Sequence, residues 1–208
     1  MALYNEIQVG RFNRFIQKLL SIKGGPPMPT VASDLQIGLD INSGAENRYL
    51  EGWDLFGNLF TVAAFAGNVA VLGLRNPVGS NVVAVVTKAI VTTAIANNPA
   101  LTLFPLGSAG ALVDQTNART ARGLDPRGRP ASTCVLTDSS GVATVAQAGG
   151  IVIDQAQMPI TSRVEFMQLL ELPLLPGTSI ALTSTVVNQA AQFGFWWRER
   201  YLEDSERS

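Results

Sequence analysis

RNPVGSNVVAVVTKAIV, residues 75–91, decides the fold, because it joins a turn cluster to a long apolar run. Asn76, Pro77 and Gly79 are residues that favour turns. The run Val82–Val91 is rich in β-branched residues and holds a single charge, Lys88, which predicts a strand. A strand this apolar is expected to be covered on both faces, by the core and by a loop, the N-terminal segment or another subunit.

Similar runs, separated by glycine and proline, lie on both sides of this stretch. Residues 107–132 read as irregular, residues 172–178 as a proline-bounded connection, and Asn188 marks a turn. Eight to ten short strands with few helices predict a mainly β fold, an antiparallel sandwich or barrel. The expected strands are 35–41, 55–67, 68–74, 82–91, 101–106, 132–137, 151–155, 163–169, 179–187 and 190–202.

The N-terminal segment has a different periodicity. Apolar residues at helical spacing predict an amphipathic helix over residues 3–23, which the sequence KGGPPMP then ends. We therefore divide the chain into a helical arm with a Pro/Gly hinge, residues 1–30, and a β domain, residues 31–208. The face of the arm expected to bind a neighbouring subunit consists of Phe12, Phe15, Ile16 and Leu19.

The composition is apolar for a chain of this length. Of the 208 residues, 47% are hydrophobic and 15% are charged, against a usual charged share of about 25%. The net charge of -1 provides no long-range attraction to nucleic acid or to an anionic membrane. No apolar run reaches the roughly 18 residues of a membrane span, and charges near the N-terminus interrupt any signal peptide. Because so few residues are charged, part of the outer surface is expected to be covered.

Catalytic and metal-binding constellations are not evident. The chain has no histidine, the commonest general base and metal ligand. Its single cysteine, Cys134, lies in a strand-like run and is expected to be a buried, inert thiol. Asp114, Asp125, Asp138 and Asp154 are interpreted as loop charges, with a catalytic carboxylate pair as the alternative. We expect no enzymatic activity, no cofactor and no metal.

Four arginines gather in the sequence RTARGLDPRGR. The simplest interpretation is a solvated loop with one Arg–Asp pair. The alternative is a contact site for a partner protein, while nucleic acid is the least favoured partner because no aromatic residues are interleaved. The candidate residues are Arg119, Arg122, Arg127 and Arg129.

The sequence FGFWWRERYL, residues 193–202, places aromatic residues at alternating positions. If Phe193, Phe195 and Trp197 fill the core, the next residue along, Trp196, emerges on the opposite face. Exposed tryptophan beside arginine is typical of interface anchors; the alternative is that a loop or the arm covers it. The candidate contact residues here are Trp196, Arg198, Arg200 and Tyr201.

Taken together, the chain resembles small structural proteins of tailed-bacteriophage particles. The resemblance rests on the helix, the hinge, the charge-poor β region and three sequences: LRNPVGSNVVAVV (74–86), PGTSIALT (176–183) and the closing WRER (197–200). It implies a jelly-roll-like β-sandwich that works in many copies.

The resemblance implies a virion structural protein, foremost a capsid decoration (cement) subunit. Its partners would be other copies of itself and virion proteins such as the major capsid protein, with assembly in the host cytoplasm and no membrane contact. A tail, neck or fibre-associated subunit is one alternative. A host-glycan-binding module using Trp53, Trp196 or Tyr49 as a platform is another. In an assembling protein, a flat, charge-poor strand such as Val82–Val91 would serve association.

Overall fold

The computed structural model describes residues 53–63, 65–124, 131–166 and 171–202. These residues form twelve strands in two antiparallel six-stranded sheets, with one short 3-10 helix, η1 (Ala109–Leu112). The predicted mainly β, antiparallel fold is therefore confirmed. The expected arm and hinge (1–30), the strand 35–41 and the boundary between arm and β domain lie outside the described residues.

The first sheet, sheet A, has the order β10-β3-β12-β1-β6, and β9 also pairs with β3. The two short strands share one edge of β3, because β10 pairs with Ala84–Val86 and β9 with Ala89–Thr93. The bounds are β1 Asp54–Val62, β3 Val82–Thr93, β6 Arg122–Gly123, β9 Ser162–Phe166, β10 Leu172–Leu174 and β12 Ala191–Tyr201.

The second sheet, sheet B, has the order β5-β7-β2-β11-β4-β8. Its longest strand, β11, lies between β2 and β4. The bounds are β2 Val69–Arg75, β4 Ala100–Phe104, β5 Asn117–Arg119, β7 Val135–Asp138, β8 Ile151–Gln155 and β11 Ser179–Val187.

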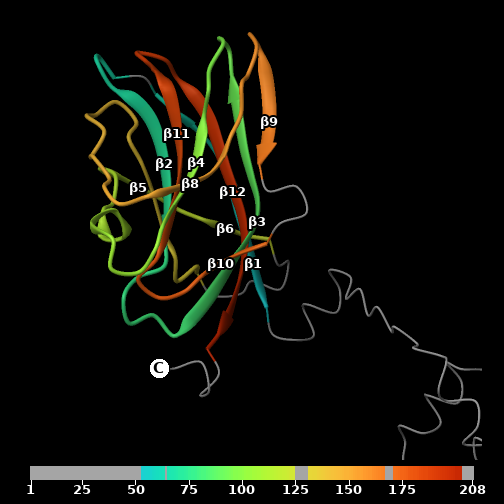
Figure 1. Cartoon of the computed structure of the whole chain (residues 1–208). Helices are drawn as coiled ribbons and strands as arrows, with labels where there is room; N and C mark the ends of the chain where they lie inside the picture. Colours follow the sequence, from blue (N-terminus) through green and yellow to red (C-terminus); the bar gives the residue numbers. More distant parts are fainter. Residues whose placement is uncertain (1–52, 64, 125–130, 167–170, 203–208) are drawn as a thin grey trace, which may run out of the picture. The chain divides into compact units, whose positions relative to one another are not determined.

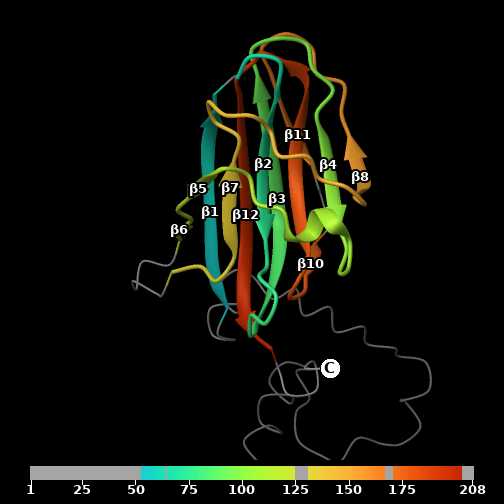
Figure 2. The same cartoon turned by 90° about the vertical axis from the view of Figure 1, so that its left-hand side faces the viewer.

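The two sheets face each other and enclose one core, a sandwich-like arrangement (Figures 1 and 2). The first four strands alternate between the sheets, so each connection crosses from one layer to the other. Sheet A contributes Phe193 and Trp197, and sheet B contributes Leu72, Ile180 and Leu182, all fully or almost fully buried. Burial of large side chains from both layers holds the sheets together.

The strand predicted from residues 82–91 is β3, which lies inside sheet A with neighbours on both edges. Ala84 and Val86 face the core, and Val83, Val85 and Ile90 on the opposite face are also buried. The prediction that both faces are covered is confirmed. The apolar composition of β3 needs no partner subunit to explain it. Its backbone is already paired with β12 on one side and with β9 and β10 on the other.

The turn before β3 is organised by Asn76, whose side chain is fully buried. Its amide nitrogen donates to the carbonyl oxygens of Val82, at 2.9 Å, and Leu174, at 2.8 Å. Its amide oxygen accepts a hydrogen bond from the hydroxyl of Ser80. Gly79, with φ of 77°, supplies the left-handed conformation that the turn requires. The turn cluster thus ties β2, β3 and β10 together.

Two expectations for the connecting regions need correction. Residues 172–178 were expected to be a connection, but Leu172–Leu174 forms β10. Proline is tolerated there because β10 is an outer strand of the sheet. Residues 107–132, expected to be irregular, contain η1 and the short strands β5 and β6. These two strands are only three and two residues long, too short to give an alternating pattern in the sequence.

We predict that Asn76→Ala lowers the free energy of unfolding by about 2–3 kcal/mol, because it leaves two buried carbonyl oxygens without their donor. Urea denaturation followed by circular dichroism would measure the change. Asn81→Ala is the matched control, since Asn81 lies in the same turn but is exposed. Equal effects of the two variants would contradict the role given to Asn76.

Candidate functional site

Strand β12 presents two chemically different faces. Phe193, Phe195 and Trp197 point into the core and are at most 1% exposed. Trp196 is partly exposed and lies on the opposite, outer face of sheet A. A bulge in β3 at this point leaves Thr87 between the residues that pair with Trp196 and Trp197, and the Thr87 hydroxyl donates to the carbonyl oxygen of Trp196. The face predicted for each tryptophan agrees with the structure.

The ring of Trp196 lies flat against the sheet because two neighbouring positions have no side chain. A Cβ atom at Gly57 would lie 2.4 Å from Cδ1 of Trp196, and one at Gly194 would lie 2.9 Å from Cζ3. Real Cβ atoms do not approach so closely, so a side chain at either position would displace the ring. The ammonium group of Lys88 lies 5.8 Å from the ring centroid, a cation–π distance.

The arginines that follow Trp196 are engaged within the domain. The guanidinium group of Arg198 forms a bidentate ion pair with Glu171, and the side chain is largely buried. It lies 4.7 Å from the ring of Trp53, and the guanidinium group of Arg200 lies 5.4 Å from the same ring. Arg198 is therefore mainly a structural residue of this end of sheet A, and not the open anchor that the sequence suggested.

The exposed part of the outer face here consists of Trp53, Trp196 and Arg200, which we call the tryptophan–arginine surface. Tyr201 alternates with Arg200 and lies on the side of Glu199. Trp53, Trp196 and Arg200 are partly exposed, and Tyr201 is 72% exposed. A surface of aromatic rings and guanidinium groups combines apolar area with hydrogen-bond donors, as protein interfaces do. Its role as a contact site stays a prediction.

The arginine-rich segment does not form one patch among the described residues. Arg119, in β5 of sheet B, forms an ion pair with the buried Asp138 and lies 5.5 Å from the ring of Phe60. Arg122, in β6 of sheet A, is exposed. Arg119 does form an Arg–Asp pair, but it does so from a strand and with the buried Asp138 of β7, and not in the solvated loop that the simplest interpretation expected. Arg127 and Arg129, like Phe12, Phe15, Ile16 and Leu19 of the arm, lie outside the described residues.

A buried carboxylate that sequence reasoning missed is the best-connected polar group of the domain. Glu199 is 4% exposed and accepts hydrogen bonds from Trp197 Nε1, at 2.7 Å, and from the backbone nitrogen of Thr133, at 2.9 Å. The hydroxyl of Ser132 and the backbone nitrogen of Cys134 also donate to it. These bonds fasten residues 132–134 to β12 and balance the cost of burying the charge.

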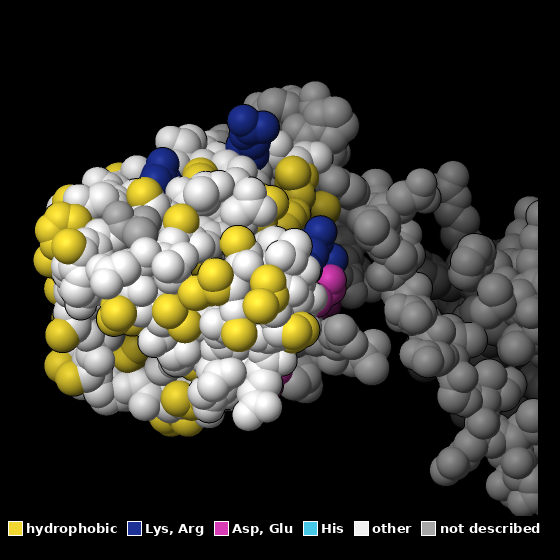
Figure 3. All heavy atoms as spheres, turned by 90° about the horizontal axis from the view of Figure 1, so that it is seen from above, with side chains coloured by type: hydrophobic (Ala, Val, Ile, Leu, Met, Phe, Trp, Pro, Cys, Tyr) yellow, Lys and Arg dark blue, Asp and Glu magenta, His cyan; other side chains and the backbone are white. Residues whose placement is uncertain are grey.

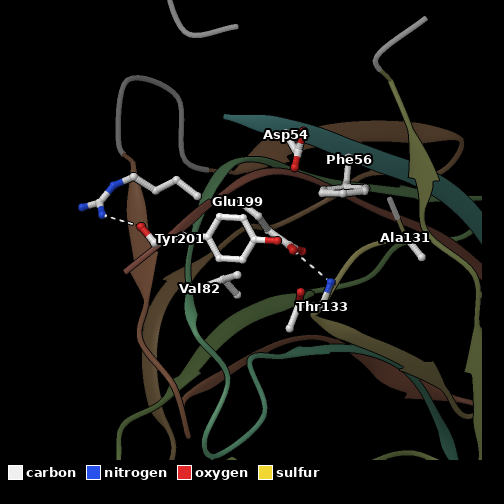
Figure 4. Close-up of a pocket in the computed structure, with 8 residues that line it drawn as sticks. Asp54, Phe56, Val82, Ala131, Thr133, Glu199 and Tyr201 are labelled. Atoms are coloured by element: carbon white, nitrogen blue, oxygen red, sulfur yellow. Dashed lines mark hydrogen bonds between the residues drawn. The ribbon is translucent and has the colours of Figure 1, made fainter. Parts of the chain in front are cut away.

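Glu199 lies in the wall of a small pocket of about 60 Å³, together with Asp54 and Tyr201 (Figure 4). Figure 4 shows the carboxylate directed at the backbone of Thr133. Because both of its oxygens already accept hydrogen bonds, Glu199 acts as a structural clamp. A general acid or base would instead need an oxygen directed at a substrate.

Two of the other candidate carboxylates are held in separate ion pairs. Asp114 pairs with Arg75 and raises its pKa, Asp138 pairs with Arg119, and Asp154 lies in the outer strand β8. The described residues contain no group of three or more histidine, cysteine, aspartate or glutamate side chains arranged to hold a metal ion. Asp125 lies outside the described residues.

Comparison of the chain with protein-family models, with curated proteins and with solved structures finds no match. Within the part of the chain that the structure describes, no helix has the length and apolar character needed to cross a membrane.

We predict that two neighbouring substitutions lower stability by very different amounts. Trp197→Ala is expected to lower the free energy of unfolding by about 3–5 kcal/mol, because it opens a cavity in the core and removes a donor to Glu199. Trp196→Ala is expected to cost less than about 1 kcal/mol, as a partly exposed residue does. Chemical denaturation of both variants would measure the difference, and equal losses would refute the assignment of faces.

We predict that the thiol of Cys134 is unreactive in the folded protein. Burial, followed by the charge and hydrogen bond of Glu199, raises its pKa well above the usual value, so the nucleophilic thiolate is scarce at pH 8. A colorimetric thiol reagent should label no cysteine in the native protein and one per chain in denaturant. Rapid labelling of the native protein would contradict the burial and the raised pKa.

Proposed function

We propose that this chain is a virion structural protein, namely a decoration (cement) subunit that stabilises a phage capsid through protein–protein contacts. The observation that carries the proposal is the scarcity of charge over the two-sheet body. Residues 55–74, 89–113, 139–153 and 172–197 contain no aspartate, glutamate, lysine or arginine. A domain that stays separate in solution is usually covered with charges, so a body of this composition suits burial among other subunits.

The exposed residues support the same view. Several large apolar side chains are more than half exposed, among them Leu106, Leu112, Ile151, Val152 and Ile160. Figure 3, which looks down on the domain, shows apolar side chains scattered among uncharged polar ones, with lysine, arginine and acidic residues only toward the margins. Scattered apolar side chains are ordinary on a surface, so the support for protein contact comes from the scarcity of charge between them.

We further propose that the sandwich is a jelly roll. Eight of its strands follow the jelly-roll succession, with β1-β12-β3-β9 in one sheet and β2-β11-β4-β8 in the other. Jelly rolls build many viral capsid proteins, but also lectins and enzymes. The strand order therefore supports a virion role but does not distinguish it from a lectin or an enzyme. The charge-poor surface is the feature that favours the virion role over those alternatives.

The proposal excludes hydrolysis as the activity. Asp114 and Asp138 are each held by a different arginine, and Glu199 is fully hydrogen-bonded, so none of them is set up as an acid–base pair. Release of reducing ends from polysaccharide by the purified chain, lost in Asp114→Asn, Asp138→Asn or Asp154→Asn, would favour an enzyme instead.

A second candidate, a glycan-binding module, is favoured by one observation: Trp53 and Trp196 are both partly exposed. Against it, the ring of Trp53 is already contacted by Arg198 and Arg200, and that of Trp196 rests on the sheet. A glycan that quenches tryptophan fluorescence in the wild type but not in Trp196→Ala would support this alternative.

The proposal is tested on purified particles from a culture that produces the chain. We expect the full-length chain to sediment with the particles and a gold-labelled antibody to decorate their heads; label on tails, necks or fibres would assign the alternative structural role. Deleting residues 1–25 or replacing Trp196 by alanine should leave the β spectrum intact and weaken particle binding at least tenfold, about 1.4 kcal/mol. A chain found only in the unsedimented fraction would refute the proposal.

A further inference from the structure

The outer edges of the two sheets differ in how they are protected. An unpaired edge strand offers its backbone to another chain, and proteins usually block it with charged residues or proline. Three of the four edges have such residues: Arg119 in β5, Arg122 in β6, and, along the edge formed by β9 and β10, Arg163, Glu165 and Pro173.

The fourth edge, strand β8, has no cation and no proline. Among the described strands it pairs only with β4, so its other side is open. Ile151 and Val152 are each 57% exposed and Ile153 is 37% exposed. A bulge in the ladder with β4 leaves Ile153 as an extra residue, which contributes to the exposure of three consecutive apolar side chains.

The segment that precedes β8, residues 139–150, contains no charged residue. Its second half, from Thr144 to Gly150, lines an open hollow of about 390 Å³ with Thr102 and Phe104 of β4. The only charge on the strand itself is Asp154. A partner for this edge must therefore be an extended, mainly apolar strand with little charge.

We propose that β8 pairs with β8 of a second copy, antiparallel about a two-fold axis, so that two copies of sheet B become one continuous sheet. The second copy offers the required chemistry, since its β8 is itself apolar and open. With the axis at Ile153, each Asp154 faces Val152 of the partner, so no like charges oppose each other. Two identical edges related in this way form a closed dimer.

The uncharged residues beside β8 would supply buried area that the pair of strands alone lacks. A stable interface buries about 800 Å² from each partner, and a five-residue edge, about 17 Å long, provides only part of it. The exposed side chains of Val145 and Leu112 add apolar area on the same sheet-B side of the body. The inference does not depend on the virion role.

The test compares two lysine variants of the full chain by sedimentation equilibrium. Val152→Lys places a charge on the β8 edge and should raise the dimer dissociation constant at least tenfold. Ile160→Lys is the matched control, because Ile160 is 72% exposed but lies outside β8; it should leave the constant unchanged. Thermal melts confirm that both variants are folded.

A cysteine variant tests the contact directly. The opposed residues at the axis of an antiparallel pair lie within the range that a disulfide spans, and the native Cys134 is buried. Ile153→Cys should therefore cross-link two chains under mild oxidation, whereas Ile160→Cys should not. Three results would each overturn the proposal. They are a wild type that is still monomeric at about 100 µM, a Val152→Lys variant that dimerises as the wild type does, and an Ile153→Cys variant that forms no cross-link.

Discussion

The alternation of side chains along β12 is the constraint on which the rest of this structure depends. Because β12 lies between β1 and β3, its inward residues, from Phe193 to Glu199, reach both the core and the segment that leads into β7. The same alternation places Trp196 and Arg198 on the outer face of sheet A, so a shift of one residue would turn these side chains inward and the aromatic core residues outward. Core and surface are therefore set by one register.

The fold was largely predictable because its long strands are uniform in composition. The bounds of β8 and β11 coincide with the predicted runs, and β3 extends the predicted one by two residues. Strand β10 was missed because Pro173 reads as a breaker, although an outer strand tolerates it. Glu199 was missed because a carboxylate after four aromatic residues reads as surface charge, and its donors lie about 65 positions earlier in the chain.

The candidate site was less predictable because the partners of its side chains come from distant parts of the chain. Arg119 and Arg122 belong to strands of different sheets, and Arg119 pairs with Asp138, 19 positions later. Arg198 looked exposed beside Trp196, but Glu171, 27 positions away, neutralises it. Pairings of this kind depend on the long connections, which no local pattern encodes.

The two glycines beneath Trp196 have a consequence for how the sequence can change. Gly57 and Gly194 leave a shallow trough across β1 and β12, and the indole ring fills it. Replacing either glycine while the tryptophan remains would push the ring outward, whereas losing the tryptophan would leave an empty trough on the sheet. Position 57 is thus expected to vary together with position 196. Gly194 is expected to stay glycine whatever residue stands at 196, because a Cβ atom there would also lie 2.8 Å from the carbonyl oxygen of Asn58.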